Sequence, residues 1–219
     1  VAPVQFVDPR ELMLQVHESL VANATAPVLA GRTVRQGDLA RLLPTDMGLS
    51  QNAAAAKSTE RTGGDERVRG DETAADEGES EKPFSVTFAR SRPVIFEARD
   101  GEIRIGIRGT RFESESGSLA RALQITAAYV PVRQPTGRLI LVRRDDVEVD
   151  FPGTRRLSVS QAGLRGTIEE KFADVFPPVL LDRELKFPTN IKRKKLAGLP
   201  IRIERIDARD GWLSISVIP

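Results

Sequence analysis

The chain has 219 residues, of which 40% are hydrophobic and 29% charged, a balance typical of globular proteins with an apolar core. A net charge of only +2 argues against a strongly basic nucleic-acid binder, and the absence of cysteine excludes disulfides, thiolate zinc sites and cysteine nucleophiles. Because no run of 18 apolar residues occurs, the sequence predicts no membrane-spanning helix.

The first predicted element is a long helix over residues 9–24. Asp8 is a suitable N-cap, Pro9 suits the first helical position, and Glu11 completes a capping box with Asp8. A helix that is apolar over roughly 200° of its wheel needs cover on more than one side. The residues that give this arc are Leu12, Met13, Leu14, Val16, Leu20, Val21 and Ala24.

Three features follow in the N-terminal half. His17, the only histidine, falls inside the apolar arc, so we expect a buried, hydrogen-bonded side chain rather than a ligand or a pH sensor. The stretch 37–44, "GDLARLLP", predicts a short helix that ends at Pro44. Residues 51–82 hold almost no large apolar side chain and are rich in acidic groups. Such a segment cannot offset its ordering entropy, so we predict that it is disordered and separates a helical arm, 1–50, from a body, 83–219, of one domain.

The body is predicted to consist mainly of strands. Apolar residues recur there at every second position, which is typical of antiparallel strands with one buried and one solvated face. The predicted strands are 84–88, 94–98, 103–107, 123–129, 138–142, 147–151, 201–203 and 213–217. The sequence "ARDG" occurs at 98–101 and again at 208–211, and Asp-Gly between two strands predicts a hairpin turn. We therefore interpret the repeated letters as turn chemistry; a duplication of two halves is the alternative, but the flanking residues do not align.

A second helix, 164–176, interrupts the predicted strands before the closing hairpin. Pro177 and Pro178 end it. Its apolar residues lie within about 120° of the helical wheel, as in an ordinary amphipathic helix; they are Leu164, Ile168, Phe172, Val175 and Phe176. The element order predicts an α+β fold.

No catalytic motif occurs in the chain. Serine hydrolase chemistry would have to use His17, and neither a G-x-S-x-G elbow nor a phosphate-binding glycine loop nor a zinc-binding H-E-x-x-H sequence is present. One histidine without cysteine cannot build a typical zinc site. We therefore expect a protein that is not an enzyme and that needs no metal and no cofactor, although paired carboxylates brought together by folding are invisible in a sequence.

A basic cluster precedes the last predicted hairpin and consists of Lys192, Arg193, Lys194 and Lys195. These side chains are candidates for contact with anionic lipid headgroups. A solvated loop is the alternative interpretation. Nucleic acid is not expected as a partner, because the cluster lacks interleaved aromatic residues on which bases could stack.

The order of the predicted elements resembles the tubular lipid-binding (TULIP) superfamily, which includes the bactericidal/permeability-increasing and synaptotagmin-like lipid-binding domains, and in particular its small bacterial envelope members. The resemblance rests on the helix 9–24, the strands from Phe84 to Phe151, the helix 164–176 and the final "GLPIRIERIDARDGWLSISV" hairpin. It implies a long N-terminal helix wrapped by a highly curved antiparallel sheet, with the second amphipathic helix before the C-terminal hairpin. It also implies a location in the bacterial envelope or periplasm.

The function implied by the resemblance is non-enzymatic binding of a lipid or another extended hydrophobic ligand between the helix and the curved sheet. The expected lining residues are Leu12, Val16, Leu20, Ile103, Ile105, Ile107, Ile168, Phe172, Phe176, Leu213 and Ile215. A membrane surface or a protein is a further expected kind of partner. The alternative is a structural or protein-interaction β domain of a larger envelope protein, with a filled core.

Overall fold

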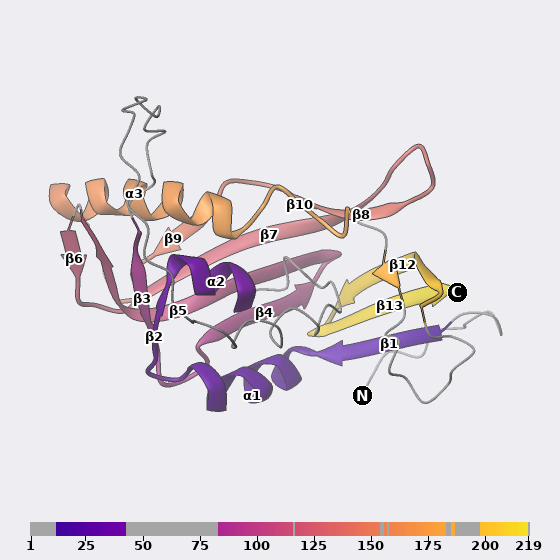
Figure 1. The fold of residues 1–219 in the computed structure, drawn as a ribbon, viewed down its shortest axis with the longest axis horizontal. Coiled ribbons are helices and arrows are strands. Elements are labelled where there is room, and N and C mark those ends of the chain that lie inside the picture. Colours follow the sequence, from indigo (N-terminus) through magenta and orange to yellow (C-terminus); the bar gives the residue numbers. More distant parts are fainter. Residues whose placement is uncertain are drawn as a thin grey trace, which may run out of the picture.

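The computed structural model describes residues 12–42, 83–115, 117–153, 156, 158–182, 185–186 and 198–218. Within these ranges the fold is α+β, with mostly antiparallel strands and few helices (Figure 1). The predicted insert 51–82 and the basic cluster 192–195 lie outside the described residues. Among the helices that the structure describes, none is both long and apolar enough to cross a bilayer.

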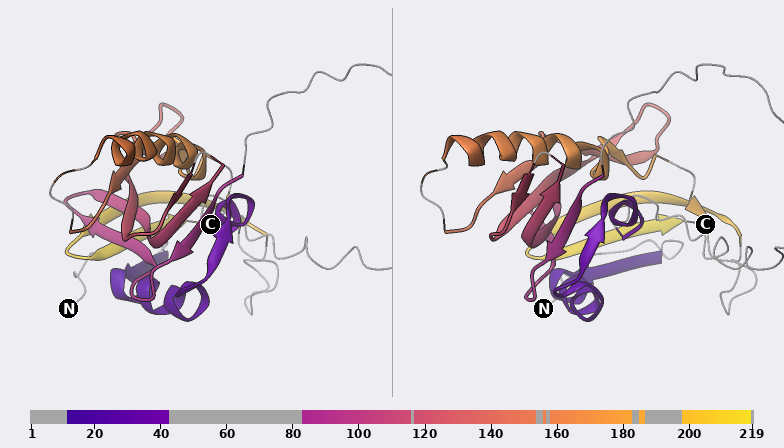
Figure 2. Two further views of the ribbon diagram at one scale, coloured as in Figure 1. Left: turned by 90° about the vertical axis from the view of Figure 1, so that its left-hand side faces the viewer. Right: turned by 60° about the vertical axis from the view of Figure 1, so that its left-hand side comes forward.

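A strongly curled sheet of nine strands forms the larger part of the fold, as Figure 2 shows from two sides. Its strands are β2 (Thr33–Arg35), β3 (Ser85–Phe88), β4 (Val94–Arg99), β5 (Glu102–Ser114), β6 (Gly117–Leu119), β7 (Leu123–Arg133), β8 (Leu139–Arg143), β9 (Glu148–Asp150) and β10 (Val179–Leu180). The main order is β10-β8-β7-β5-β3-β2, while β4 and β6 pair with β5 and β9 pairs with β7. The antiparallel pairing and the strong curvature confirm those parts of the predicted fold.

The alternation along β5 separates the two faces of this sheet. Ile103, Ile105 and Ile107 are at most 8% exposed and face the core, whereas Arg104 on the opposite face is half-buried. Gly106 lies between them, and a Cβ atom at this position would come within 2.2 Å of the Ile125 carbonyl oxygen. Only glycine allows the backbones of β5 and β7 to approach this closely.

A smaller sheet of four strands packs at one end of the curled sheet. Its order is β1-β13-β12-β11, with β1 (Leu12–His17), β11 (Leu185–Lys186), β12 (Pro200–Arg209) and β13 (Trp212–Ile218). Strand β12 contacts both β4 and β8. The apolar face of the small sheet joins the core through Ile206, Ala208 and Leu213, which are at most 9% exposed.

The predicted helix over residues 9–24 is wrong in its first half. Residues 12–17 form β1, which pairs with β13 from Leu12 opposite Val217 to His17 opposite Trp212. The helix α1 (Glu18–Leu29) has 12 residues and begins after His17, whose side chain accepts a hydrogen bond from the Ser19 N–H at 3.2 Å. The stretch Leu-Met-Leu-Gln-Val-His also satisfies a period of two, and pairing with β13 decides in favour of the strand.

His17 therefore does not occupy the environment expected from the helical wheel. Its ring is hydrogen-bonded, with Nδ1 2.8 Å from the Ser19 hydroxyl, but it is only half-buried at the end of β1. The ring packs edge-on against Trp212 with a centroid distance of 4.8 Å. These contacts give His17 a local structural role at the start of α1.

Two further helices match their predictions more closely. The short helix α2 (Gln36–Leu42) lies where the sequence predicts it, and the second predicted helix is α3 (Val159–Val175). A capping box starts α3, since the Gln161 N–H donates to the Ser158 hydroxyl at 3.3 Å and the Ser158 N–H donates to the Gln161 side chain at 3.1 Å. This box lies several residues before the predicted start, so α3 is longer than expected.

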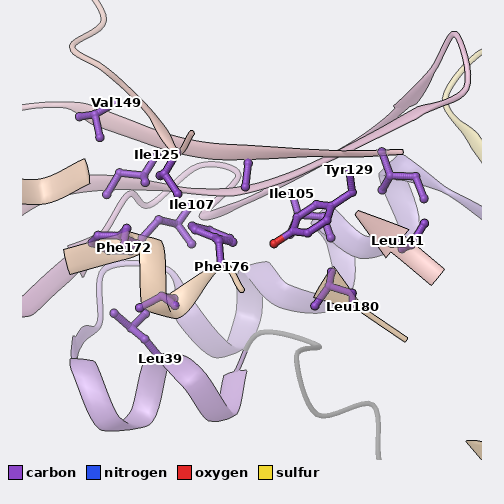
Figure 3. Packing of buried hydrophobic residues seen from close by; sticks show 14 of the residues in the cluster. Leu39, Ile105, Ile107, Ile125, Tyr129, Leu141, Val149, Phe172, Phe176 and Leu180 are labelled. Atoms are coloured by element: carbon purple, nitrogen blue, oxygen red, sulfur yellow. The ribbon is translucent and has the colours of Figure 1, made fainter. Parts of the chain in front are cut away.

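The helix that packs on the inner face of the curled sheet is α3, and not the N-terminal helix. Phe172 of α3 and Phe176, the residue that follows its last turn, point toward Ile107 and Ile125 of the sheet (Figure 3). Figures 1 and 2 show α1 on the opposite side of the molecule from α3. The expectation that the sheet wraps the N-terminal helix is thus corrected, because residues 12–17 extend the small sheet and shorten α1.

Candidate functional site

Most of the predicted ligand-lining residues form the protein core. The buried ones are at most 9% exposed, and they are Ile103, Ile105, Ile107, Ile168, Phe172, Phe176 and Leu213. The ring of Phe172 lies 5.0 Å from that of Phe84 and 6.1 Å from that of Phe176, measured between centroids. Side chains packed in this way fill the space between the curled sheet and α3.

The remaining predicted lining residues lie elsewhere. Leu12 and Val16 are on β1, where they share the apolar face of the small sheet with Ile215. Leu12 is 40% exposed. Leu20 lies on α1 and is 58% exposed. Leu12, Val16 and Leu20 were expected on one face of a single helix. Instead, Leu12 and Val16 lie in a strand and Leu20 lies in the helix that follows it.

An open apolar groove is lined by residues in or next to β8, β10 and β12, where the two sheets meet. Figure 1 shows where these strands lie. This groove, which we call the junction groove, has a volume of about 490 Å³. Its apolar lining consists of Leu139, Leu181, Leu185, Pro200, Ile201, Ile203 and Ile218, with Thr136, Arg138 and Arg202 also lining it. Leu139 and Ile203 are buried, whereas most of the other apolar members are half-buried and so remain accessible.

Arginine side chains tie the β7–β8 hairpin to the elements that surround the groove. Arg133 donates one hydrogen bond to the Gly137 carbonyl at 2.7 Å and another to the Glu204 carbonyl on β12 at 2.5 Å. Arg138 donates to the Leu181 carbonyl at 3.1 Å. These bonds fix the hairpin over the small sheet, so the groove is held by polar contacts at its margin.

Leu181 combines two unusual properties in the junction groove. It lines the groove, and its backbone has φ of 63°, in the left-handed region that a leucine rarely adopts. Such a conformation costs of order 1 kcal/mol or more and persists only where neighbouring contacts hold it. The hydrogen bond from Arg138 to its carbonyl is one of those contacts.

Positive charge lies at the edge of the junction groove. The Arg202 side chain is 66% exposed and makes an ion pair of 2.5 Å with Glu204, and Arg138 is half-buried. An apolar floor with cationic groups at its margin suits a ligand with a long apolar part and an acidic end. The described lining residues of the groove are apolar or cationic, apart from Thr136.

Among the titratable groups of the described residues, Tyr129 has the one clearly shifted pKa, and it lies in the core and does not line this groove. Burial raises the pKa of Tyr129 to about 12, while the nearby positive charge of Arg143 acts in the opposite direction. The hydroxyl donates to the Pro177 carbonyl at 3.0 Å. Tyr129 thus stays neutral at physiological pH, and its hydrogen bond joins β7 to the end of α3.

The described residues contain no cluster of three or more histidine and acidic side chains that could hold a metal ion. Two short ion pairs join carboxylates to arginines on the surface: Arg144 contacts Glu102 at 2.7 Å, and Arg165 contacts Glu169 at 2.7 Å. These pairs lie on partly exposed surface, where they contribute little to stability.

Reasoning from the sequence did not identify the junction groove. Leu139, Ile201 and Ile203 belong to predicted strands, but their periodicity says only that they face an apolar environment. Leu181 follows the short strand β10 and gave no periodic signal at all. The groove depends on where the β7–β8 hairpin lies over the small sheet, and local patterns do not contain this information. The basic cluster 192–195 lies outside the described residues, so its predicted headgroup contact remains a prediction.

Comparison of the chain with protein-family models, with curated proteins and with solved structures gave no match.

Proposed function

We propose that the protein binds a lipid or another extended apolar ligand in the junction groove without catalysing a reaction. The observation that carries this proposal is the groove itself, an open cavity of about 490 Å³ lined mainly by apolar side chains of both sheets. Burial of ligand methylene groups there contributes roughly 0.8 kcal/mol for each group that leaves water. Arg138 gives the groove a positive charge that complements an acidic headgroup, while the charge of Arg202 is shared with Glu204.

The proposal includes a relationship to the TULIP superfamily and a location in the bacterial envelope. The curled antiparallel sheet, the helix α3 and the closing hairpin of β12 and β13 support it. The proposed ligand position differs from the one that the resemblance implied, since the space between the curled sheet and α3 is occupied by core side chains. A ligand in the junction groove needs no opening of that core.

The test compares a groove substitution with a matched surface substitution. Native mass spectrometry of the gently purified protein should show co-purified lipid, and a fluorescent fatty acid should bind to the delipidated protein. Ile201→Trp fills groove space and should weaken this binding by tenfold or more, while the thermal midpoint changes little. Val159→Trp is the control, because Val159 is 92% exposed and does not line the groove.

A different set of results would contradict ligand binding in the junction groove. If the parent protein carries no lipid and binds no fatty acid, and if Ile201→Trp costs roughly 1–3 kcal/mol through overpacking, the groove is a packed part of the fold. That combination of results would contradict the proposal.

The second candidate function is a protein-interaction β domain with a filled core. It is favoured by β1, which within the described residues has β13 as its one strand neighbour and carries Leu12 and Leu14 at 40% and 57% exposure. An apolar strand at the edge of a sheet is a template for pairing with another chain. Under this alternative Leu14→Lys changes the association state seen by sedimentation, whereas under the lipid proposal it leaves fatty acid binding unchanged.

A further inference from the structure

A second cavity lies between α1 and strand β4 at the side of the curled sheet. This cavity, the arginine cleft, has a volume of about 420 Å³. Arg90, Arg92 and Arg108 line it together with apolar side chains that include Ala22 and Phe96. It shares no lining residue with the junction groove, so an inference about it does not depend on the proposed function.

The backbone brings the three arginines to one place. The Ala89 N–H donates to the Arg108 carbonyl at 2.8 Å, and the Arg108 N–H donates to the Pro93 carbonyl at 2.8 Å. Both ends of the stretch 90–92 are therefore held against the same residue of β5, and the stretch loops out between β3 and β4. Interruptions of this kind redirect side chains and recur beside functional sites.

Arg92 is held in an unfavourable backbone conformation. Its φ is 47°, and the described residues contain three other non-glycine residues with positive φ. Asp100 and Asp210 belong to Asp-Gly hairpin turns, where this conformation is expected. The remaining one, Leu181, lines the junction groove. The positive φ of Arg92 is thus not explained by an Asp-Gly hairpin turn. Backbone strain of this kind concentrates at binding sites.

The arginine end of the cleft carries uncompensated positive charge. Neither Arg90 nor Arg92 has an ion-pair or side-chain hydrogen-bond partner within the described part of the chain. Arg108 donates to the neutral Gln124 side chain at 3.3 Å. Arg90 and Arg92 are exposed and Arg108 is half-buried. Because like charges that lie close together repel one another, an anion that joins the three guanidinium groups is favoured there.

The carboxylates of the cleft lie toward its other end. Glu18 begins α1 and is 3.9 Å from Arg99, the last residue of β4. Val94 is the residue of β4 nearest to the stretch 90–92. Glu97 lies three residues farther along β4, so its backbone is roughly 10 Å from that of Val94, at about 3.3 Å per residue. Arg90 lies instead beside Gly31, just beyond the C-terminal end of α1. The cleft is therefore polarised along its length.

We propose that the arginine cleft binds the phosphate group of an anionic ligand. Guanidinium groups match phosphate oxygens with paired, charge-assisted hydrogen bonds, and three of them suit a group that presents several charged oxygens. The Asn23 side chain on α1 also lines the cleft and adds a neutral donor. The phosphate group can belong to an anionic phospholipid headgroup or to a free phosphate compound. The apolar side chains of Ala22, Ala26 and Phe96 also line the cleft and can contact an apolar substituent of either ligand.

The test uses the full chain and two probes. Inorganic phosphate is titrated into the protein by calorimetry, and vesicles of phosphatidylglycerol in phosphatidylcholine are cosedimented with it, with pure phosphatidylcholine vesicles as the reference. Binding of phosphate alone assigns the site to free phosphate compounds, and binding of the anionic vesicles assigns it to a lipid headgroup. Either result supports the proposal if it depends on the cleft arginines.

That dependence is tested with Arg90→Gln/Arg92→Gly. Glycine at position 92 removes one charge and relieves the left-handed backbone, so the thermal midpoint should stay equal or rise while the dissociation constant rises at least tenfold. Arg111→Gln/Arg165→Gln is the charge-matched control, since both arginines are ion-paired and lie outside the cleft; it should change the constant less than twofold. Arg92→Gly alone provides the same readout with a smaller perturbation.

Two results overturn the proposal. One is a parent protein that binds neither inorganic phosphate nor anionic vesicles. The other is equal weakening by the cleft variant and the control, because binding would then follow overall charge rather than the cleft. Ile201→Trp in the junction groove should leave phosphate binding unchanged, which keeps the outcome for this cleft separate from that for the groove.

Discussion

Ala98 and Ala208, the first residues of the two ARDG sequences, each accept a hydrogen bond from the other's hairpin turn. The Gly211 N–H donates to the Ala98 carbonyl at 2.9 Å, and the Gly101 N–H donates to the Ala208 carbonyl at 2.9 Å. Both alanines are at most 1% exposed. The two turns thus join the curled sheet to the small sheet through a reciprocal pair of bonds, in addition to reversing the chain.

The two turn glycines provide a matched pair of substitutions. Gly101 and Gly211 have φ of 78° and 80°, so alanine at either position should cost about 1 kcal/mol through the left-handed backbone alone. At Gly211 the added Cβ would also lie 3.2 Å from Glu18 Cδ and 3.3 Å from His17 Nε2, whereas at Gly101 it meets nothing within 4 Å. Urea unfolding should therefore show that Gly211→Ala loses more stability than Gly101→Ala. Equal losses would mean that the contact with α1 is easily relieved.

The inward register of β5 predicts opposite responses at neighbouring positions. Ile105 is 8% exposed in the core, so Ile105→Asp buries a charge without a partner and should cost several kcal/mol or prevent folding. The Arg104 side chain is 43% exposed and makes an ion pair of 3.4 Å with Glu102, so Arg104→Asp should cost about 1 kcal/mol or less. Thermal unfolding of the two variants checks this, and similar losses would contradict the register.

The buried tyrosine predicts a loss of stability in alkali. Burial raises the pKa of Tyr129 to about 12 in the folded chain, above the value of 10.0 for an ordinary tyrosine. Between these pH values the unfolded chain has lost the proton that the folded chain retains, so stability falls as pH rises through this window and is unaffected below it. A shift of this size corresponds to about 2–3 kcal/mol in total.

The measurement is urea unfolding of the parent and of Tyr129→Phe at intervals from pH 8 to pH 11.5. The phenylalanine variant lacks the hydrogen bond to the Pro177 carbonyl and should be less stable at pH 8 by about 1–2 kcal/mol. The difference between the two proteins should then shrink above pH 10. Parallel curves would show that Tyr129 does not titrate with a raised pKa.

The capping box of α3 predicts a specific cost for a surface hydroxyl. Ser158→Ala removes the acceptor for the Gln161 N–H and should cost about 1 kcal/mol, although Ser158 is exposed. Thr167→Ala is the control, because its hydroxyl bonds back to the Gly163 carbonyl within the helix, at 3.4 Å, and alanine is the better helix former. Chemical denaturation should show a loss for the first variant only; a loss of similar size for both would argue against capping.

Eight strands of the body could be predicted because their signal is local, whereas the short strands β6, β10 and β11 were not predicted. Ile103, Ile105 and Ile107 alternate with polar residues, and the burial observed for β5 follows that alternation. The turns at Asp100 and Asp210 could be predicted for the same reason, since Asp-Gly tolerates the positive φ that both turns have. The apolar stripe of α3 was also correct, with Ile168 and Phe172 fully buried.

The first helix shows where local signals fail. Residues 12–17 fit both a helical arc and a strand alternation, and the capping signal at Asp8 favoured the helix. The pairing of β1 with β13, some 200 residues away in the chain, decides between the two. As a consequence Leu12 and Val16 lie in a sheet and Leu20 on α1, and the predicted lining set is divided.

Local periodicity and turn chemistry thus determined most strands of the body, the second helix, both hairpin turns and the buried side of β5, because each depends on residues a few positions apart. Tertiary structure alone decided that α3 covers the curled sheet, that residues 12–17 join β13, and that the two ARDG turns bond to each other. It also decided the junction groove and the arginine cleft, each of which unites residues from separate elements. Their lining residues are neighbours only after long-range pairing has placed the sheets, and no pattern along the chain specifies that placement.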